Sequence, residues 1–176
     1  NAQYCEFLNA VDYQVVQDYA LYDNNMGLDS TRGGIAIVIA NPPGSRFVVR
    51  PNMADKPVNN VNWLSAARFA NWLQNGQGNA STETGTYPLN GSMTYGAYPR
   101  ASNGIGLPTH NEWFKAAYYR PGSYAAYPTG ANLSQTPVIA GCDGTGNVYI
   151  TNSNLVNYGN GCDWNGQDGN VTNVGS

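Results

Sequence analysis

The chain has 176 residues and a formal net charge of −3, and only 11% of its residues are charged, against about 25% in an average soluble protein. Asn, Gly, Ser, Thr and 13 Tyr supply the polarity instead, a composition that we associate with extracellular proteins. The eight Lys and Arg residues are scattered, which argues against a nucleic-acid binder with its clustered cationic face. No apolar run approaches the ~18 residues of a membrane span. The chain opens at Asn1 rather than Met, so we expect a removed leader or a truncated start.

Apolar residues at helical spacing predict a first helix behind Asn1, which is a good capping residue. The apolar face of this helix comprises Tyr4, Phe7, Leu8 and Val11. Residues 19–26 are predicted to be irregular. Two glycines then precede a strand over residues 35–40, and a Pro-Pro-Gly turn separates it from a second strand over residues 46–50. The two strands are predicted to form a hairpin with a longer loop.

Two further helices are predicted. Asn62 caps the second helix. Its predicted apolar face comprises Trp63, Ala66, Ala67, Ala70 and Leu73. Residues 76–106 are predicted to be loop. The third helix runs from Thr109 to about Tyr119, and Thr109 with Glu112 forms the pattern of a capping box. Beyond this helix we expect almost no regular structure, with scattered Tyr and Trp side chains anchoring an ordered irregular surface.

Three cysteines leave the pairing open. Cys142 and Cys162 lie in the same Asn- and Gly-rich tail, where they either close a disulfide loop, worth roughly 3 kcal/mol, or remain two unpaired thiols. Cys5 lies in the first helical pattern and is predicted to be a small buried hydrophobe. None has the neighbouring His or cationic cluster of an activated nucleophile.

Several blocks of this sequence follow one family pattern in order and spacing. They are Asn1-Ala2-Gln3-Tyr4 with Phe7, Pro57 to Trp63 with Ala66 to Leu73, Leu107-Pro108-Thr109 with Glu112-Trp113 and Ala116-Ala117, and Tyr127-Pro128-Thr129-Gly130. Together they resemble the formylglycine-generating (sulfatase-modifying factor) family. The resemblance implies an α+β fold of the C-type-lectin-like kind, with few helices, a small antiparallel sheet and much ordered coil. It also implies a single domain over residues 1–176, which we expect to be incomplete at both ends.

Two positions depart from the family pattern. Gly106 replaces the usual Arg, and His110 replaces the first Glu of the "PTEAEWE" block. Both changes remove charges that the family often places in its interior. His110, the only histidine, is predicted to be a surface helix residue rather than a catalytic base.

The tail is dense in oxygen donors, which suit Ca²⁺. The resemblance implies a structural calcium site made by Asn157, the carbonyl of Tyr158, Asp168 and the carbonyl of Asn170. A network of Asn and Asp turns that needs no metal is the alternative. The run from Asp143 to Asn147 is a lesser candidate and is predicted to be a plain turn.

The family oxidises a substrate cysteine with O₂ and Cu(I), which two thiolates hold in its C-terminal third. This sequence stops before those cysteines, so no catalytic residue is assigned. We favour a non-catalytic module, secreted or extracytoplasmic, that binds a protein or carbohydrate ligand or assembles with itself. The alternative is a fragment of a copper-dependent oxidase, in which copper binds only if a missing C-terminal part exists.

Overall fold

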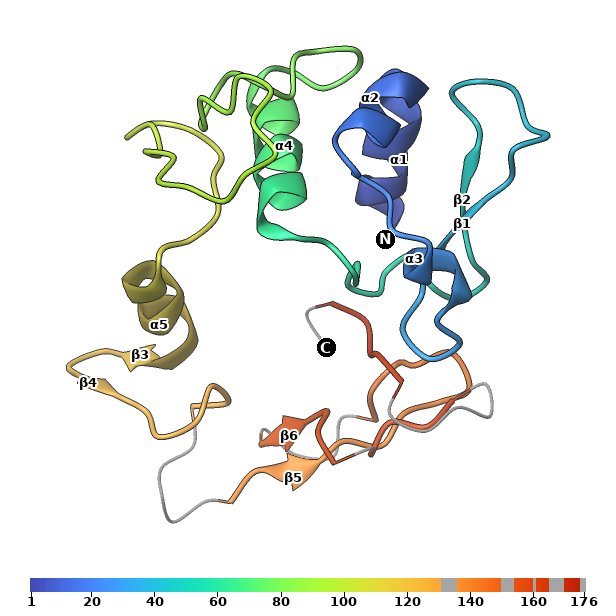
Figure 1. Cartoon of the computed structure of the whole chain (residues 1–176). Helices are drawn as coiled ribbons and strands as arrows, with labels where there is room; N and C mark the ends of the chain where they lie inside the picture. Colours follow the sequence, from blue (N-terminus) through green and yellow to red (C-terminus); the bar gives the residue numbers. More distant parts are fainter. Residues whose placement is uncertain (131–135, 150–153, 160, 165–169, 175–176) are drawn as a thin grey trace. The chain divides into compact units, whose positions relative to one another are not determined.

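The computed structural model describes residues 1–130, 136–149, 154–159, 161–164 and 170–174. Its contacts divide the chain into two compact units, Asn1–Leu107 (unit 1) and Pro108–Ser176 (unit 2), and Figure 1 shows the elements of each. The described residues form five helices and three two-stranded sheets, which gives the predicted α+β class. Among them is no helix long and apolar enough to cross a membrane. A single domain over residues 1–176 stays a prediction.

Unit 1 begins with α1 (Ala2–Ala10), the first predicted helix. The predicted apolar residues are all buried, as is Cys5: Tyr4, Phe7, Leu8 and Val11. Asn1 occupies the capping position, but its side chain makes no capping bond, so that part of the prediction was wrong. Its Nδ2 instead donates to the carbonyl of Met53 at 2.8 Å, a partner 52 residues away that the local pattern does not contain.

Two short helices follow that the sequence did not predict. They are α2 (Tyr13–Asp18), capped by the Asp12 carboxylate, and α3 (Asn25–Leu28), which begins inside the stretch expected to be irregular. Helices of 6 and 4 residues are too short to show a periodic apolar stripe. Isolated helices of this length are also unstable, so burial of Val16 and Met26 in the core has to hold them.

The predicted hairpin is present, but each strand is shorter than expected. β1 (Ile35–Ile37) pairs antiparallel with β2 (Phe47–Val49). The Asn9 side chain covers the outer edge of β2, since its Oδ1 accepts from the Phe47 amide at 3.0 Å and its Nδ2 donates to the Phe47 carbonyl at 2.8 Å. A side-chain amide thus takes the place of a third strand.

Replacing Gly33 with Ala is expected to lower the free energy of unfolding by about 1–3 kcal/mol. The new Cβ would lie 2.6, 2.8 and 2.9 Å from the carbonyl oxygens of Asp29, Met26 and Asn25. These are main-chain atoms, so no side-chain rotation relieves the overlap. Urea denaturation measures the effect. Gly96→Ala is the control, because its Cβ would meet the nearest ring atoms at an ordinary 3.7 Å; equal losses in the two variants would contradict the argument.

The second predicted helix is α4 (Trp63–Gln74), and the Oδ1 of Asn62 caps it by accepting from the Ser65 amide at 2.9 Å. The predicted apolar face of this helix is only partly buried, and its first residue, Trp63, is 38% exposed. The buried residues are Leu64, Ser65, Ala67, Arg68, Ala70, Asn71 and Trp72. Polar Arg68 and Asn71 belong to the buried face because they bind the following loop, which a pattern of apolar residues cannot register.

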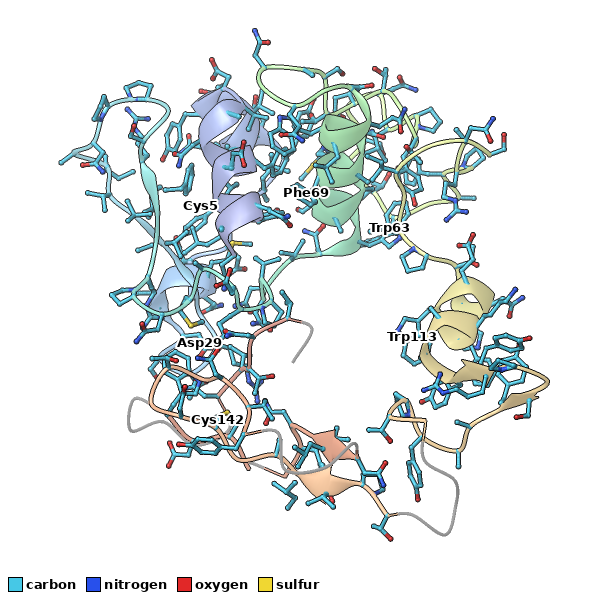
Figure 2. The ribbon with its side chains drawn as sticks, turned by 180° about the vertical axis from the view of Figure 1, so that it is seen from behind. Cys5, Asp29, Trp63, Phe69, Trp113 and Cys142 are labelled. Carbon is cyan, nitrogen blue, oxygen red and sulfur yellow. A yellow bond between two sulfur atoms is a disulfide. The ribbon has the colours of Figure 1, made fainter. Side chains whose placement is uncertain are left out.

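Aromatic rings join α1 to α4. The Phe69 ring centroid lies 5.5 Å from that of Tyr4, 5.4 Å from that of Phe7 and 5.7 Å from that of Trp72. Figure 2 shows Phe69 on the side of α4 that is next to α1. The contacts with Tyr4 and Phe7 are tilted or edge-on, and the contact with Trp72 is stacked. Aromatic pairs of these kinds add about 0.5–1.5 kcal/mol each to the burial of apolar area.

Residues 76–106 contain no helix or strand, as predicted, and buried polar side chains order them instead. The fully buried Arg68 forms a two-pronged ion pair with Glu83, with Nε–Oε1 at 2.7 Å and Nη2–Oε2 at 3.0 Å. Asn71 donates to the carbonyls of Thr82 and Tyr87 and accepts from the Tyr87 amide, each at 2.8 Å. Contacts from α4 therefore replace the hydrogen bonds that regular structure would provide.

Unit 2 begins with α5 (His110–Tyr118), which carries the complete predicted capping box. The Glu112 amide donates to the Thr109 hydroxyl at 3.3 Å, and the Thr109 amide donates to the Glu112 carboxylate at 2.8 Å. The remaining strands have two residues each, in line with the expected scarcity of regular structure. They are the antiparallel pair β3 (Tyr119–Arg120) and β4 (Ser123–Tyr124), and the parallel pair β5 (Val138–Ile139) and β6 (Leu155–Val156).

Candidate functional site

Two of the four predicted calcium positions lie in hydrogen-bond contact. Asn157 directly follows β6, and its Nδ2 donates to the main-chain carbonyl of Asn170 at 3.0 Å. The third predicted ligand, the Tyr158 carbonyl, accepts from the Gly161 amide at 3.2 Å and keeps a second lone pair. The fourth, Asp168, lies outside the described residues.

The Asn170 side chain is buried with one acceptor unpaired. It is 3% exposed, and its Nδ2 donates to the Trp164 carbonyl at 2.8 Å, but its Oδ1 has no hydrogen-bond partner in the described part of the chain. An unsatisfied buried acceptor costs about 1–3 kcal/mol, which a cation would remove. The sequence pointed to the main-chain carbonyl of Asn170, and the structure adds this side-chain oxygen. In the Asn157 amide, Oδ1 is the atom able to ligate a metal, while Nδ2 donates to the Asn170 carbonyl.

The donors around Asn170 are of one chemical kind. In the described part of the chain, no three His, Cys, Asp or Glu side chains gather closely enough to hold a metal ion. Amide and carbonyl oxygens suit Ca²⁺, whereas softer metals prefer thiolate and imidazole. The residues present therefore fit calcium, with Asp168 as the predicted acidic ligand, and the site stays a prediction.

The cysteines resolve into one bridge and one buried thiol. Cys142 and Cys162 form a disulfide across a sequence separation of 20 residues, which confirms the bridged alternative, and Figure 2 places Cys142 in the tail. Cys5 is free and buried, and its Sγ donates to the Phe47 carbonyl at 3.2 Å. Burial raises the pKa of the Cys5 thiol. Residues 1–176 thus supply no pair of thiolates.

The Asp143 loop forms a turn closed by its own side-chain hydrogen bonds. The Asp143 carboxylate accepts from the Thr145 hydroxyl at 2.7 Å and amide at 2.8 Å, and from the Asn147 amide at 3.0 Å and side chain at 3.1 Å. These hydrogen bonds hold the pKa of Asp143 well below its usual range. The Asp143 carboxylate is therefore hydrogen-bonded by N–H and O–H groups of its own loop.

Unit 2 also carries a group of aromatic side chains on α5, β3 and β4. This aromatic cluster comprises Trp113, Phe114, Tyr118, Tyr119 and Tyr124. Its ring centroids lie 4.9–5.9 Å apart in successive contacts, and four of the five residues are 40–54% exposed. The β3–β4 turn sets Tyr124 opposite Tyr119, which brings it to Phe114 at 5.2 Å. Figure 2 shows Trp113 on α5, a helix with no buried residue.

One comparison with known proteins identifies the family. The family model described as "Sulfatase-modifying factor enzyme 1-like domain" matches residues 1–154, most of the chain. The chain belongs to the sulfatase-modifying factor family. No curated protein and no solved structure matches it. The fold expected of this family, α+β and C-type-lectin-like, is confirmed, whereas the calcium positions Asn157 to Asn170 follow the matched residues and gain no support from the match.

The two departures from the family pattern are explained by their neighbours. At Gly106, a Cβ would meet the Arg100 side chain at 2.7 Å, and Arg100 Nη1 donates to the Leu107 carbonyl at 2.9 Å. A guanidinium is therefore still present beside position 106, although it comes from a different residue. His110 is exposed and its ring stacks on Phe114 at 6.3 Å, which confirms the predicted surface helix residue.

The aromatic cluster of this family member was not predicted, although the sequence contains a signal for it. Pro121-Gly122 lies between Tyr119-Arg120 and Ser123-Tyr124, and Gly122 has a positive φ of 82°. Pro followed by Gly is the pattern of a tight turn. That pattern predicts a hairpin that folds Tyr124 back on Tyr119, at a point where almost no regular structure was expected.

Proposed function

We propose that the chain is a non-catalytic binding module of the sulfatase-modifying factor family that assembles through its aromatic cluster. The observation that carries this proposal is the packing of exposed rings on one another. Phe114 touches both Tyr118 and Tyr124, so these side chains are ordered before a partner arrives. Binding then loses little side-chain entropy, and aromatic residues supply much of the binding energy at protein interfaces.

The ring geometry favours a protein partner over a carbohydrate. Phe114 and Tyr118 stack with an interplanar angle of 27°, which uses their faces on each other, whereas a sugar needs an open ring face. Lys115 and Arg120 add positive charge, while Glu112 is held in the capping box. The complementary partner is an apolar protein surface bordered by acidic groups. This chain has a net charge of −3, so a second copy is the partner to test first.

The double variant Trp113→Ala/Tyr124→Ala is expected to weaken self-association at least tenfold, since it removes two half-exposed rings that an interface would bury. Sedimentation velocity over a concentration series measures the dimerisation constant. Tyr149→Ala is the matched control, because Tyr149 is 57% exposed but lies outside the cluster. A wild-type chain that stays monomeric, or a control as strong as the double variant, would contradict assembly. Binding of neutral oligosaccharides that the double variant loses would assign the cluster to carbohydrate instead.

The disulfide supports a secreted or extracytoplasmic location as part of the same proposal. Structural disulfides persist in oxidising compartments and are rare where thiols are kept reduced. The Cys142–Cys162 bridge joins two parts of a tail that has little regular structure of its own. Thiol labelling of the protein taken from its native source tests this, because a cytoplasmic protein would show three reactive cysteines after denaturation rather than one.

Calcium is the second component of the proposal. We expect Ca²⁺ to raise the melting temperature of the wild-type chain and EGTA to lower it, because the cation would occupy the unpaired Oδ1 of Asn170. A concentration of 100 times Kd corresponds to about 2.7 kcal/mol of stabilisation. Asp168→Ala should abolish the shift, whereas Asp163→Ala, an exposed acid in the same tail, should retain it. An unchanged melting temperature in EGTA would exclude the site.

An oxidase that converts a substrate cysteine to formylglycine is the second candidate function, and the family match favours it. Its copper ion requires two thiolates, but here Cys142 and Cys162 are bridged and Cys5 is buried. The oxidase therefore needs thiols from outside residues 1–176. The intact mass of the native protein, followed by Cu(I) titration with a cysteine-containing sulfatase peptide, distinguishes the two candidates.

A further inference from the structure

Unit 1 contains a pocket of about 470 Å³ that belongs to none of the sites described above. It is bounded by the end of α1, the turn into α2, the loop that joins β1 to β2, and Asn79. Its volume falls within the range of small-molecule sites, which is about 300–1,000 Å³. All of its residues belong to the same compact unit.

The pocket combines apolar walls with a polar rim. Leu8, Val11 and Phe47 line it and are themselves 1%, 7% and 4% exposed, so they are fixed by the core behind them. The Asn9 amide also lines the pocket, but both of its ends are engaged by the main chain of Phe47. Recognition of a polar ligand therefore falls to the charged groups at the rim.

Two opposite charges line this one pocket without neutralising each other. The Asp12 carboxylate uses Oδ1 to accept from the Gln14 amide at 2.7 Å, and no described residue donates to its Oδ2. The Arg46 guanidinium lies 4.4 Å from the Tyr13 ring centroid, and its Nε donates to the Asn41 carbonyl at 3.4 Å. Its terminal N–H groups have no described acceptor. Among the described residues, Arg68 and Glu83 form an ion pair, but Asp12 and Arg46 do not.

We propose that this pocket binds a small zwitterion of the α-amino-acid type with an apolar side chain. Arg46 receives the ligand's carboxylate, since a guanidinium presents a planar set of donors to that group. Asp12 receives the ammonium group through its unengaged Oδ2. The apolar side chain packs against Ala10, Tyr13 and Pro43, the apolar lining residues that keep exposed surface, since Leu8, Val11 and Phe47 behind them are almost completely buried. A ligand with one charge leaves one of the two protein charges unpaired, so the pocket selects against it.

Isothermal titration of the full chain with leucine tests the proposal, and two analogues each lack one charge. Leucinamide has no carboxylate, and 4-methylpentanoate has no ammonium group. We expect leucine to bind at least tenfold more tightly than either analogue, which corresponds to ~1.4 kcal/mol. Arg46→Gln should weaken leucine and 4-methylpentanoate but leave leucinamide unchanged. Asp12→Asn, which keeps a good capping residue for α2, should weaken leucine and leucinamide but leave 4-methylpentanoate unchanged.

Arg32→Gln is the charge-matched control, because Arg32 is exposed and does not line the pocket. Amide chemical shifts of Tyr13 and Phe47 locate the binding and show that the variants remain folded. The proposal is overturned if leucine shows no binding at millimolar concentration, if an analogue binds as well as leucine, or if Arg32→Gln weakens leucine as much as Arg46→Gln. None of these outcomes depends on self-association through the aromatic cluster.

Discussion

Glu83→Ala is expected to lower the free energy of unfolding by about 3–5 kcal/mol, the loss typical when one partner of a buried ion pair is removed. The variant leaves the guanidinium of Arg68 fully buried with no counter-charge. Arg68 would keep a hydrogen bond to the Ser92 carbonyl at 2.8 Å and its contact with the Tyr19 ring at 4.0 Å. Its Nη1 already lacks a hydrogen-bond partner among the described residues, and neither retained contact supplies a counter-charge.

Guanidinium denaturation measures this loss, with Glu6→Ala as the control because Glu6 is exposed on α1. The control should stay within about 0.5 kcal/mol of the wild type. The double variant Arg68→Met/Glu83→Ala should recover part of the loss, since it removes both charges. A loss below ~1 kcal/mol in Glu83→Ala would show that water reaches the guanidinium and that the pair is not a buried one.

The same pair makes stability depend on pH. Burial alone would raise the pKa of Glu83, but hydrogen bonds from Arg68, Thr82 and Gly91 outweigh it, and the folded pKa is lowered. The stabilisation is therefore complete above the ordinary pKa of a glutamate, about 4.3, and is lost as the pH falls through the lowered value. Between pH 7 and pH 3, the wild type should lose more stability than Glu83→Gln, and an identical pH dependence would refute this.

The double variant Cys142→Ser/Cys162→Ser is expected to destabilise unit 2 by about 3 kcal/mol, because the bridge closes a loop across 20 residues. The reduced chain gains conformational freedom mainly in its unfolded state. The bridge also adjoins the predicted calcium site, since the Asn170 amide donates to the Cys162 carbonyl at 3.1 Å. The variant should therefore bind Ca²⁺ more weakly as well as unfold more readily.

Hydrogen exchange of the Trp164 indole, which donates to the Val171 carbonyl at 2.9 Å, measures the local effect. Exchange at the Trp72 indole in unit 1, which donates to the Gly78 carbonyl at 2.8 Å, should be unchanged. Dithiothreitol should reproduce the effect in the wild type and have none in the double variant. Equal protection of Trp164 in both proteins would mean that the tail is held by other contacts.

Local patterns gave the long elements of this chain correctly. The Thr109–Glu112 capping box, the Asn62 cap and the apolar stripe of the first helix involve residues at most a few positions apart, so the sequence displays them directly. Three of the four family blocks overlap these helices, and the family was identified largely from the same residues.

Contacts between distant residues were not visible in the sequence. The buried face of α4 was misplaced because Arg68 is neutralised by Glu83, 15 positions away, and polar residues that pair at such distances give no periodic signal. The Asn1 amide was expected to cap α1 but binds Met53. The pocket between Asp12 and Arg46 likewise depends on the hairpin returning to the end of α1.

The sequence by itself determined the family, the α+β class, the helices with caps and the oxygen-rich tail, because each depends on neighbouring residues or on residue type. The tertiary structure alone decided that Cys142 pairs with Cys162, that Asn170 buries an unpaired oxygen and that the rings around Phe114 form one exposed cluster. Burial and pairing depend on which residues are close in space. In a chain with so much coil, these residues are often far apart in the sequence, so no periodic pattern predicts their contacts.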